Sequence, residues 1–120
     1  FVWQVPHHVG ELLSPQERQE GIHAGDAETS LMLAILPDQV QMDRAVKEYP
    51  PRPSQTTLLS LEGALPFSWI TRDISKSGVV GDATVATAEK GEKILADVAA
   101  GWVTVLEEIY RFEPPQRWCD

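Results

Sequence analysis

The stretch that decides the fold runs His23-Ala-Gly-Asp-Ala-Glu-Thr-Ser-Leu-Met-Leu-Ala-Ile-Leu-Pro-Asp38. It predicts a helix that begins at Asp26, because aspartate is a good N-cap and Glu28 then places a negative charge in the first turn, where the helix dipole favours it. Pro37 ends this helix. Beyond its first turn the segment is almost entirely apolar, so we expect it to be buried on most sides.

The same stretch could carry chemistry, because His23 directly precedes a helix start and lies beside Gly25 and two carboxylates. A helix N-terminus offers free N–H groups to an oxyanion or a bound carboxylate. A histidine there can move a proton, and a neighbouring carboxylate can fix its tautomer. Alternatively, Asp26 caps the helix, Glu28 complements the dipole, and His23 merely bonds a loop carbonyl. From spacing alone the second, structural interpretation is favoured, because perturbed functional sites are rarer than helix caps.

Downstream of this helix, a proline-rich connection lies between Lys47 and Pro66, and Phe67 to Ile70 is predicted as a short strand. Ser75 to Gly78 and Gly81-Asp82 have the composition of loops. The last element is the clearest, because apolar residues recur at three- and four-residue steps from Thr87 to Arg111, which predicts one face of a long helix. Its apolar positions are Ile94, Leu95, Val98, Trp102, Val105, Leu106 and Ile109.

Upstream, Phe1 to Val5 is predicted as a strand that Pro6 ends. The chain has no initiator Met and opens directly on this element, so we expect that it was cut from a longer protein. His7 and His8 are interpreted as surface loop histidines, since adjacent side chains in an extended segment point to opposite sides. A strand, a helix, an irregular arm and a long closing helix together predict an α/β layered fold.

Composition limits the function classes. The chain has 120 residues, enough for one domain, and its net charge of −8 disfavours nucleic acid and anionic membranes as partners. No secretory signal is visible and the single Cys119 cannot form an internal disulfide, so a cytoplasmic location is expected. The sequence contains no Gly-x-Ser-x-Gly elbow, P-loop, dinucleotide fingerprint, His-Glu-x-x-His or paired Cys-x-x-Cys. Nucleophilic hydrolysis, nucleotide binding and a structural zinc site therefore lack support.

Two blocks of the sequence resemble the creatininase (creatinine amidohydrolase) family. The block from His23 to Asp38 is similar to the family's His-(Ala/Gly)-Gly-x-x-Glu-Thr-Ser-Leu-x-Leu segment. The block from Ser77 to Gly91 is similar to its Gly-x-x-Gly-Asp-x-Thr-x-Ala-Thr-x-Glu-Lys-Gly stretch. The blocks occur in the family's order, so the resemblance covers most of the chain from Ile22 onward. It implies that residues 1–120 are the C-terminal part of a three-layer α/β/α fold.

The resemblance also implies an activity. Such enzymes are hydrolases of C–N bonds, other than peptide bonds, in cyclic or linear amides. They use two divalent metal ions (zinc, manganese or iron) that activate a water and polarise the carbonyl. His23 and Glu28 would be catalytic, with Glu28 either orienting His23 or serving as a candidate metal ligand. Gly25, Asp26 and Trp3 are predicted to contact the substrate.

Departures from the family pattern sharpen this prediction. The family's main metal ligands, a Glu-x-His-Gly…Asp block and an Asn-Gly-His block, are absent from the chain. Alone it is therefore expected to bind no metal and to be inactive, with the missing N-terminal portion of the fold as a partner. A tryptophan that precedes the histidine in creatininase is absent from Arg18 to Ile22. This makes another small amide, such as a formamide on a pyrimidine, as plausible a substrate as creatinine.

Three further expectations concern a turn, the assembly and a role without catalysis. Asp82 is interpreted as a turn residue rather than a catalytic one. The resemblance implies a closed homo-oligomer, in which the proline-rich arm would reach a neighbouring subunit. The alternative function is a non-catalytic creatininase-like subunit or fragment that acts in assembly or ligand binding.

Overall fold

The structure is a computed structural model that describes residues 4–51 and 58–114. Its helices are α1 (Pro15–Glu20), α2 (Asp26–Ile35), α3 (Thr71–Ile74) and α4 (Ala88–Arg111), and its strands are β1 (Lys47–Glu48) and β2 (Gly81–Asp82). Short 3₁₀ turns occur at Val9–Leu12, Pro37–Gln39, Met42–Arg44 and Ala83–Val85. Helices and strands are mixed, as the sequence predicts for an α/β fold. The three-layer arrangement remains a prediction.

The long helix α4 confirms the predicted periodicity and boundaries. Thr87 is its N-cap, and the Thr87 side chain accepts a hydrogen bond from the backbone N–H of Lys90. Along α4 the buried residues are Gly91, Ile94, Val98 and Gly101. Gly91 permits close contact with α2, because a Cβ atom there would lie 1.9 Å from the carbonyl oxygen of Ser30. The two segments that carry the sequence motifs thus pack directly against each other.

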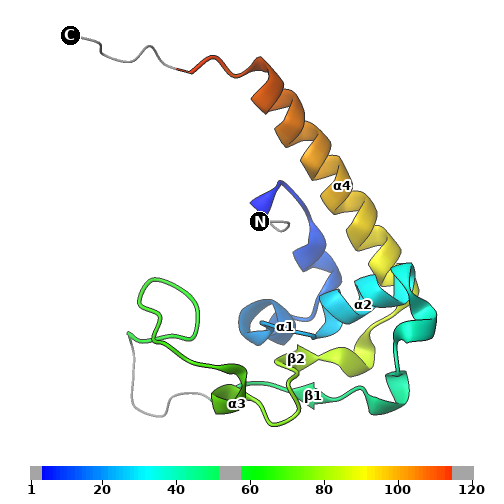
Figure 1. Cartoon of the computed structure of the whole chain (residues 1–120), viewed down its shortest axis with the longest axis vertical. Coiled ribbons are helices and arrows are strands. Elements are labelled where there is room, and N and C mark those ends of the chain that lie inside the picture. The colour runs from blue at the N-terminus through cyan, green and yellow to red at the C-terminus, as the bar shows by residue number, and fades with distance from the viewer. Residues whose placement is uncertain (1–3, 52–57, 115–120) are drawn as a thin grey trace.

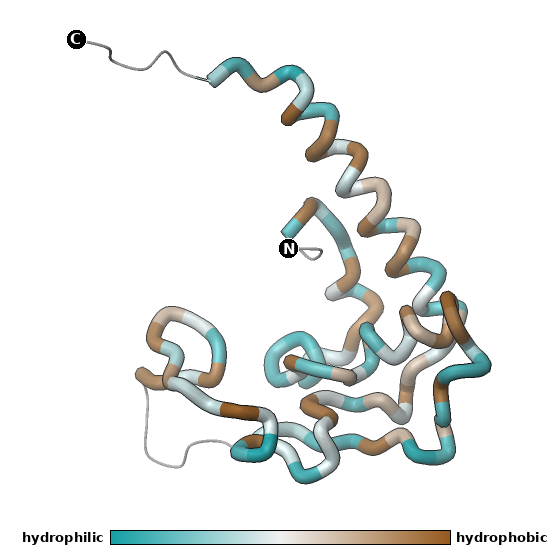
Figure 2. The backbone as a smooth tube through the Cα atoms, in the orientation of Figure 1, coloured by the Kyte–Doolittle hydropathy of each residue, from teal (hydrophilic) through white to brown (hydrophobic). Residues whose placement is uncertain are grey.

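The apolar core is small and lies between the N-terminal segment and the first half of α4. Val5, Val9, Ile94 and Val98 form its buried centre. Partly buried side chains surround this centre: Leu12, Leu13, Ala27, Leu31, Trp102 and Val105. Towards its C-terminus α4 extends away from the rest of the chain (Figure 1), and Figure 2 shows that apolar residues continue along this part.

The two strands form a minimal antiparallel sheet. Lys47 pairs with Asp82 and Glu48 pairs with Gly81. An isolated antiparallel bridge between His23 and Val80 extends this contact to the loop before α2. Gly81-Asp82 was predicted as loop, and that prediction is wrong: the backbone of these residues pairs with β1, which their turn-like composition could not reveal.

Three other predicted segments differ from the structure or lie partly outside the described residues. Phe67 to Ile70 has no ladder partner among the described residues and leads into α3, so it is not a strand. Most of the predicted strand Phe1 to Val5 lies outside the described residues, and Gln4 and Val5 themselves form a turn. Helix α2 ends before Pro37 as predicted, but it is not buried on most sides, since Met32, Ile35 and Leu36 are exposed.

The exposed apolar surface also includes the second half of α4. Leu106, Ile109 and Tyr110 there are 57%, 61% and 91% exposed. Three of the seven predicted apolar positions, Leu95, Leu106 and Ile109, are thus exposed. None of the described helices is long and apolar enough to cross a membrane.

Candidate functional site

The loop from Ile22 to Gly25 positions the first candidate catalytic residue. The backbone N–H groups of Ile22 and His23 donate to the carbonyl oxygen of Val80 over 2.8 and 3.1 Å, and the N–H of Val80 donates back to the His23 carbonyl over 2.8 Å. Ala24 adopts a left-handed backbone with φ of 52°, which is uncommon for a residue with a side chain. The two motifs therefore meet at this loop, and the chain turns sharply there into α2.

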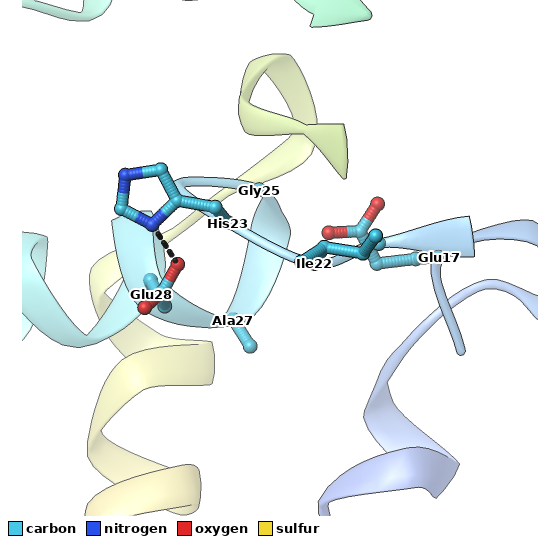
Figure 3. A pocket seen from close by; sticks show the side chains of 7 residues that line it. Glu17, Ile22, His23, Gly25, Ala27 and Glu28 are labelled. Carbon is cyan, nitrogen blue, oxygen red and sulfur yellow. Dashed lines mark ion pairs between the residues drawn. The ribbon is translucent and has the colours of Figure 1, made fainter. Parts of the chain in front are cut away.

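His23 and Glu28 form a pair at the start of α2. The Nδ1 atom of His23 lies 3.5 Å from Oε2 of Glu28, and the two side chains are 62% and 46% exposed. The same Glu28 oxygen accepts a hydrogen bond from the backbone N–H of Ala24. Figure 3 shows the second ring nitrogen of His23 on the side away from Glu28. The Glu28 carboxylate thus lies beside one ring nitrogen of His23, and the second nitrogen lies on the other side of the ring.

Asp26 has a different place from the one predicted. It is the first residue of α2 rather than its N-cap, which is Gly25, so the capping prediction is wrong. Its carboxylate is 2% exposed and accepts from Nζ of Lys90 over 2.6 and 2.7 Å and from the Ser30 hydroxyl over 3.2 Å. The Asp26 side chain is turned towards α4, because Lys90 offers it a charged partner inside the protein.

Glu17 is a buried residue of this site that sequence reasoning missed. It lies in α1, is 6% exposed, and its Oε1 atom accepts from the backbone N–H of Asp26 over 2.7 Å. Its Oε2 atom accepts from the N–H of Asp82 over 2.9 Å and from the Tyr49 hydroxyl over 2.7 Å. Glu17 thus caps α2 from another helix, which explains why Asp26 does not cap α2.

The sequence around Glu17 contains a local signal, but that signal predicts a different role for the Glu17 side chain. Ser14-Pro15-Gln16-Glu17 has the spacing of a capping box, and the Ser14 hydroxyl does accept from the Glu17 N–H over 3.0 Å. A capping box would turn the glutamate side chain back towards Ser14. Here that side chain points inward, and Gly25 makes room for it, since a Cβ at Gly25 would lie 2.0 Å from Glu17 Oε1.

Two groups near Glu17 have shifted acidities. Burial, together with the hydrogen bond to the Glu17 carboxylate, raises the pKa of the Tyr49 hydroxyl, so it stays a donor. For Asp82, burial raises the pKa, but hydrogen bonds from Thr84 and Lys47 outweigh it and the pKa is lowered. Asp82 accepts from the backbone N–H of Thr84 and pairs with Lys47 at 3.1 Å. The Asp82 backbone thus belongs to β2, and its side chain caps the 3₁₀ turn Ala83–Val85 that follows.

Two depressions meet at the His23–Glu28 pair. The first has a volume of about 200 Å³ and is lined by Glu17, Gly21, Ile22, His23, Gly25, Ala27 and Glu28. The second, of about 680 Å³, shares His23 and Glu28 and is otherwise mostly apolar, with Leu31, Met32, Ile35 and Val40 among its lining residues. Gly25 therefore borders the first depression through its backbone, whereas Trp3 lies outside the described residues.

Metal ligands are few in the described part of the chain. Within residues 4–51 and 58–114 no group of three or more His, Cys, Asp or Glu side chains could hold a metal ion. His23 and Glu28 together offer two donors. The described residues therefore do not by themselves fit a complete metal site.

Residues 1–106 match the family model Creatininase, described as creatinine amidohydrolase. The chain belongs to the creatininase family. A curated relative, the mycofactocin precursor peptide peptidase of Mycolicibacterium smegmatis strain ATCC 700084 / mc(2)155, is 34% identical over 92 residues, which are 77% of this chain and 34% of the relative.

Solved structures agree with this membership. A structure named creatininase Mn is 29% identical with a TM-score of 0.61, covering 87% of this chain and 38% of the other. A putative creatinine amidohydrolase from Bacteroides fragilis NCTC 9343 has a TM-score of 0.68 at 23% identity, covering 91% and 44%. At that identity the second likeness shows the fold alone. The creatininase-like chain spans about a third of the curated relative's length.

Proposed function

We propose that this chain forms one side of the active site of an amide hydrolase, in which His23 transfers a proton and Glu28 orients it. The observation that carries the proposal is the 3.5 Å contact between His23 Nδ1 and Glu28 Oε2, at a helix start that borders two depressions. Histidine with a carboxylate behind it is a common arrangement for general acid–base catalysis.

The chemistry of the C–N bond explains why a proton donor is needed here. An amide nitrogen leaves poorly as an anion, so it must gain a proton as the bond to carbon breaks. A protonated His23 can supply that proton from the ring nitrogen that faces outward. Glu28 then stabilises the imidazolium form before the transfer, because its carboxylate lies beside Nδ1.

The metal dependence of the complete enzyme is also part of the proposal. We place the main ligands of a divalent pair (zinc, manganese or iron) outside the described residues, with Glu28 as a candidate additional ligand. The structure named creatininase Mn supports a divalent metal in the family. Metal analysis of the complete enzyme, purified without chelator, should find stoichiometric metal.

The substrate proposed is a small cyclic or linear amide, bound with contacts from Gly25 and Trp3. The predicted contact with Asp26 is not part of it, because the buried Asp26 carboxylate already pairs with Lys90. A second candidate is a peptide, favoured because the curated relative is named a precursor peptide peptidase. Assays with both classes separate these candidates. The C-terminal place in a three-layer fold, a cytoplasmic location and a homo-oligomeric assembly complete the proposal.

A non-catalytic role in assembly or ligand binding is the alternative. The test is His23→Ala in the complete enzyme, with His8→Ala as control, because His8 is an exposed histidine that pairs with Asp97. His23→Ala should lower turnover by about 10²–10⁴-fold, and the control should leave it unchanged. Wild-type turnover in His23→Ala would refute the assigned role.

A further inference from the structure

The Glu17 carboxylate is buried, yet the proposed proton transfer does not use it. A buried carboxylate is costly unless donors surround it. The donors of Glu17 come from three segments: the first residue of α2, strand β2, and Tyr49 directly after β1. A side chain that ties together three segments distant in the sequence stabilises a particular arrangement of them.

The arrangement that Glu17 stabilises includes the backbone of His23. His23 forms its bridge with Val80 just before the chain reaches Asp26 on one side and Asp82 on the other. One Glu17 oxygen accepts from the N–H of Asp26 and the other from the N–H of Asp82. The carboxylate therefore joins the two segments immediately beyond the bridge and holds them at a fixed separation.

We infer that Glu17 is a positioning residue of this site: it fixes the loop that presents His23 without touching the reacting atoms. The inference rests on the proposed function of His23. The loop is also held by the His23–Val80 bridge and by the contact of the Ala24 N–H with Glu28, and Glu17 adds the link between the first residue of α2 and strand β2. Without the carboxylate, the start of α2 and the His23 ring would move relative to β2.

The variant Glu17→Gln keeps the size of the side chain but removes its charge and one of its two oxygen acceptors. A glutamine keeps one oxygen acceptor but turns an NH₂ group towards a backbone N–H, so one donor loses its partner. We expect kcat to fall by about 10²-fold, because a displacement of about 1 Å at a catalytic group has such an effect. KM should change little. Tyr49→Phe, which removes one donor and keeps the ring, should give a smaller loss in the same direction.

The matched control is Glu20→Gln, on the same helix, where the carboxylate accepts from the Gln16 amide at the surface over 2.8 Å. It should leave turnover unchanged. Amide hydrogen exchange supplies a readout that does not depend on activity. In Glu17→Gln the N–H of Ala24, which contacts Glu28 rather than Glu17, should exchange faster, whereas the N–H groups of Ile94 and Val98 in α4 should not.

The outcomes distinguish this inference from the proposed function. Wild-type turnover in His23→Ala overturns the proposed function itself. If His23→Ala is impaired but Glu17→Gln changes neither kcat nor Ala24 exchange, only the positioning role is overturned. Uniformly faster exchange through α4 would show a general structural role and overturn it as well. Should Glu17→Gln fail to fold, the same measurements on Tyr49→Phe decide: slower turnover with faster Ala24 exchange supports the inference, and no change overturns it.

Discussion

Two carboxylates lie within the first turn of α2, and each pairs with a basic side chain. The two pairs, Asp26–Lys90 and Glu28–His23, differ in burial, in distance and in surroundings. Asp26 is 2% exposed and pairs with Lys90 at 2.6 Å, with a further hydrogen bond from Ser30. Glu28 is 46% exposed and lies 3.5 Å from His23, which is itself largely in solvent. Although the two carboxylates are only two residues apart in sequence, Asp26 faces helix α4 and Glu28 borders two open depressions.

The difference teaches how one helix start can serve both stability and chemistry. A buried ion pair with its hydrogen bonds satisfied holds α2 against α4 and cannot exchange partners without large cost. An exposed histidine with a carboxylate behind it contributes little to stability but can still meet a ligand. We therefore expect substitutions at the two pairs to separate into effects on unfolding and effects on turnover.

The largest effect is expected for Asp26→Ala. It leaves the Lys90 ammonium, whose side chain is 19% exposed, without its carboxylate, so the free energy of unfolding should fall by about 3 kcal/mol. Urea unfolding of the complete protein measures this. The double variant Asp26→Ala/Lys90→Met should recover part of the loss, because no unpaired charge remains. A loss below about 1 kcal/mol in the single variant would mean that the pair does not hold α2 to α4.

Glu28→Gln should give the next largest effect, on turnover rather than on stability. Glutamine can keep the contact with the Ala24 N–H but carries no charge to stabilise the imidazolium, so kcat/KM should fall by about 10²-fold, equivalent to about 2.7 kcal/mol. The unfolding free energy should change by less than about 0.5 kcal/mol. The control is Glu89→Gln, which removes an exposed pair with Lys93 at 2.7 Å and should alter neither.

Gly25→Ala tests whether the close packing between the two pairs tolerates an added side-chain atom. The new Cβ would lie 2.0 Å from Glu17 Oε1 and 3.1 Å from the Gly81 Cα, so the loop must shift, at a cost of about 2 kcal/mol in unfolding free energy. Turnover should fall as well, because His23 belongs to this loop. In Gly10→Ala the nearest atom is the flexible Arg18 side chain at 3.3 Å, so a much smaller change is expected. Equal effects in both variants would contradict the close packing around Glu17.

Sequence reasoning succeeded where local signals decide the structure. The boundaries of α4 follow from periodicity, and Pro37 marks the end of α2 correctly. The sequence allows either Thr84 or Thr87 as the cap of α4, and the structure has Thr87 there. The sequence places both Asp26 and Glu28 within one turn of His23 without choosing between them, and in the structure it is Glu28 that lies beside the histidine. Their catalytic roles stay predictions.

The other features of the fold and of the site could not be predicted from local sequence, because they depend on contacts between residues that are distant in the sequence. Glu17 and the Asp82 backbone are 65 residues apart in sequence, and only the folded chain shows that the glutamate replaces Asp26 as the cap of α2. Strand β2 consists of a glycine and an aspartate whose pairing with Lys47-Glu48 has no local signature. Periodicity also does not specify which apolar side chains of α2 and α4 are exposed, because exposure depends on the segments that lie beside each helix.

The smallest effect expected is a pH dependence far from both pairs. Glu48 accepts from the backbone N–H groups of Lys76 and Ser77 over 2.7 and 2.9 Å and from the Ser77 hydroxyl. These bonds, the one from Lys76 first, lower the pKa of the Glu48 carboxyl from 4.5 to about 2. Because the folded-state pKa is depressed, the contribution to stability is complete above about pH 4.5 and is lost as the pH falls towards 2. Glu48→Gln should therefore flatten the acid limb of the unfolding midpoint measured against pH, and Ser77→Ala should flatten it partly. If the acid limb of Glu48→Gln overlays that of the wild type, the loop from Ser75 to Gly78 is not held by this charge.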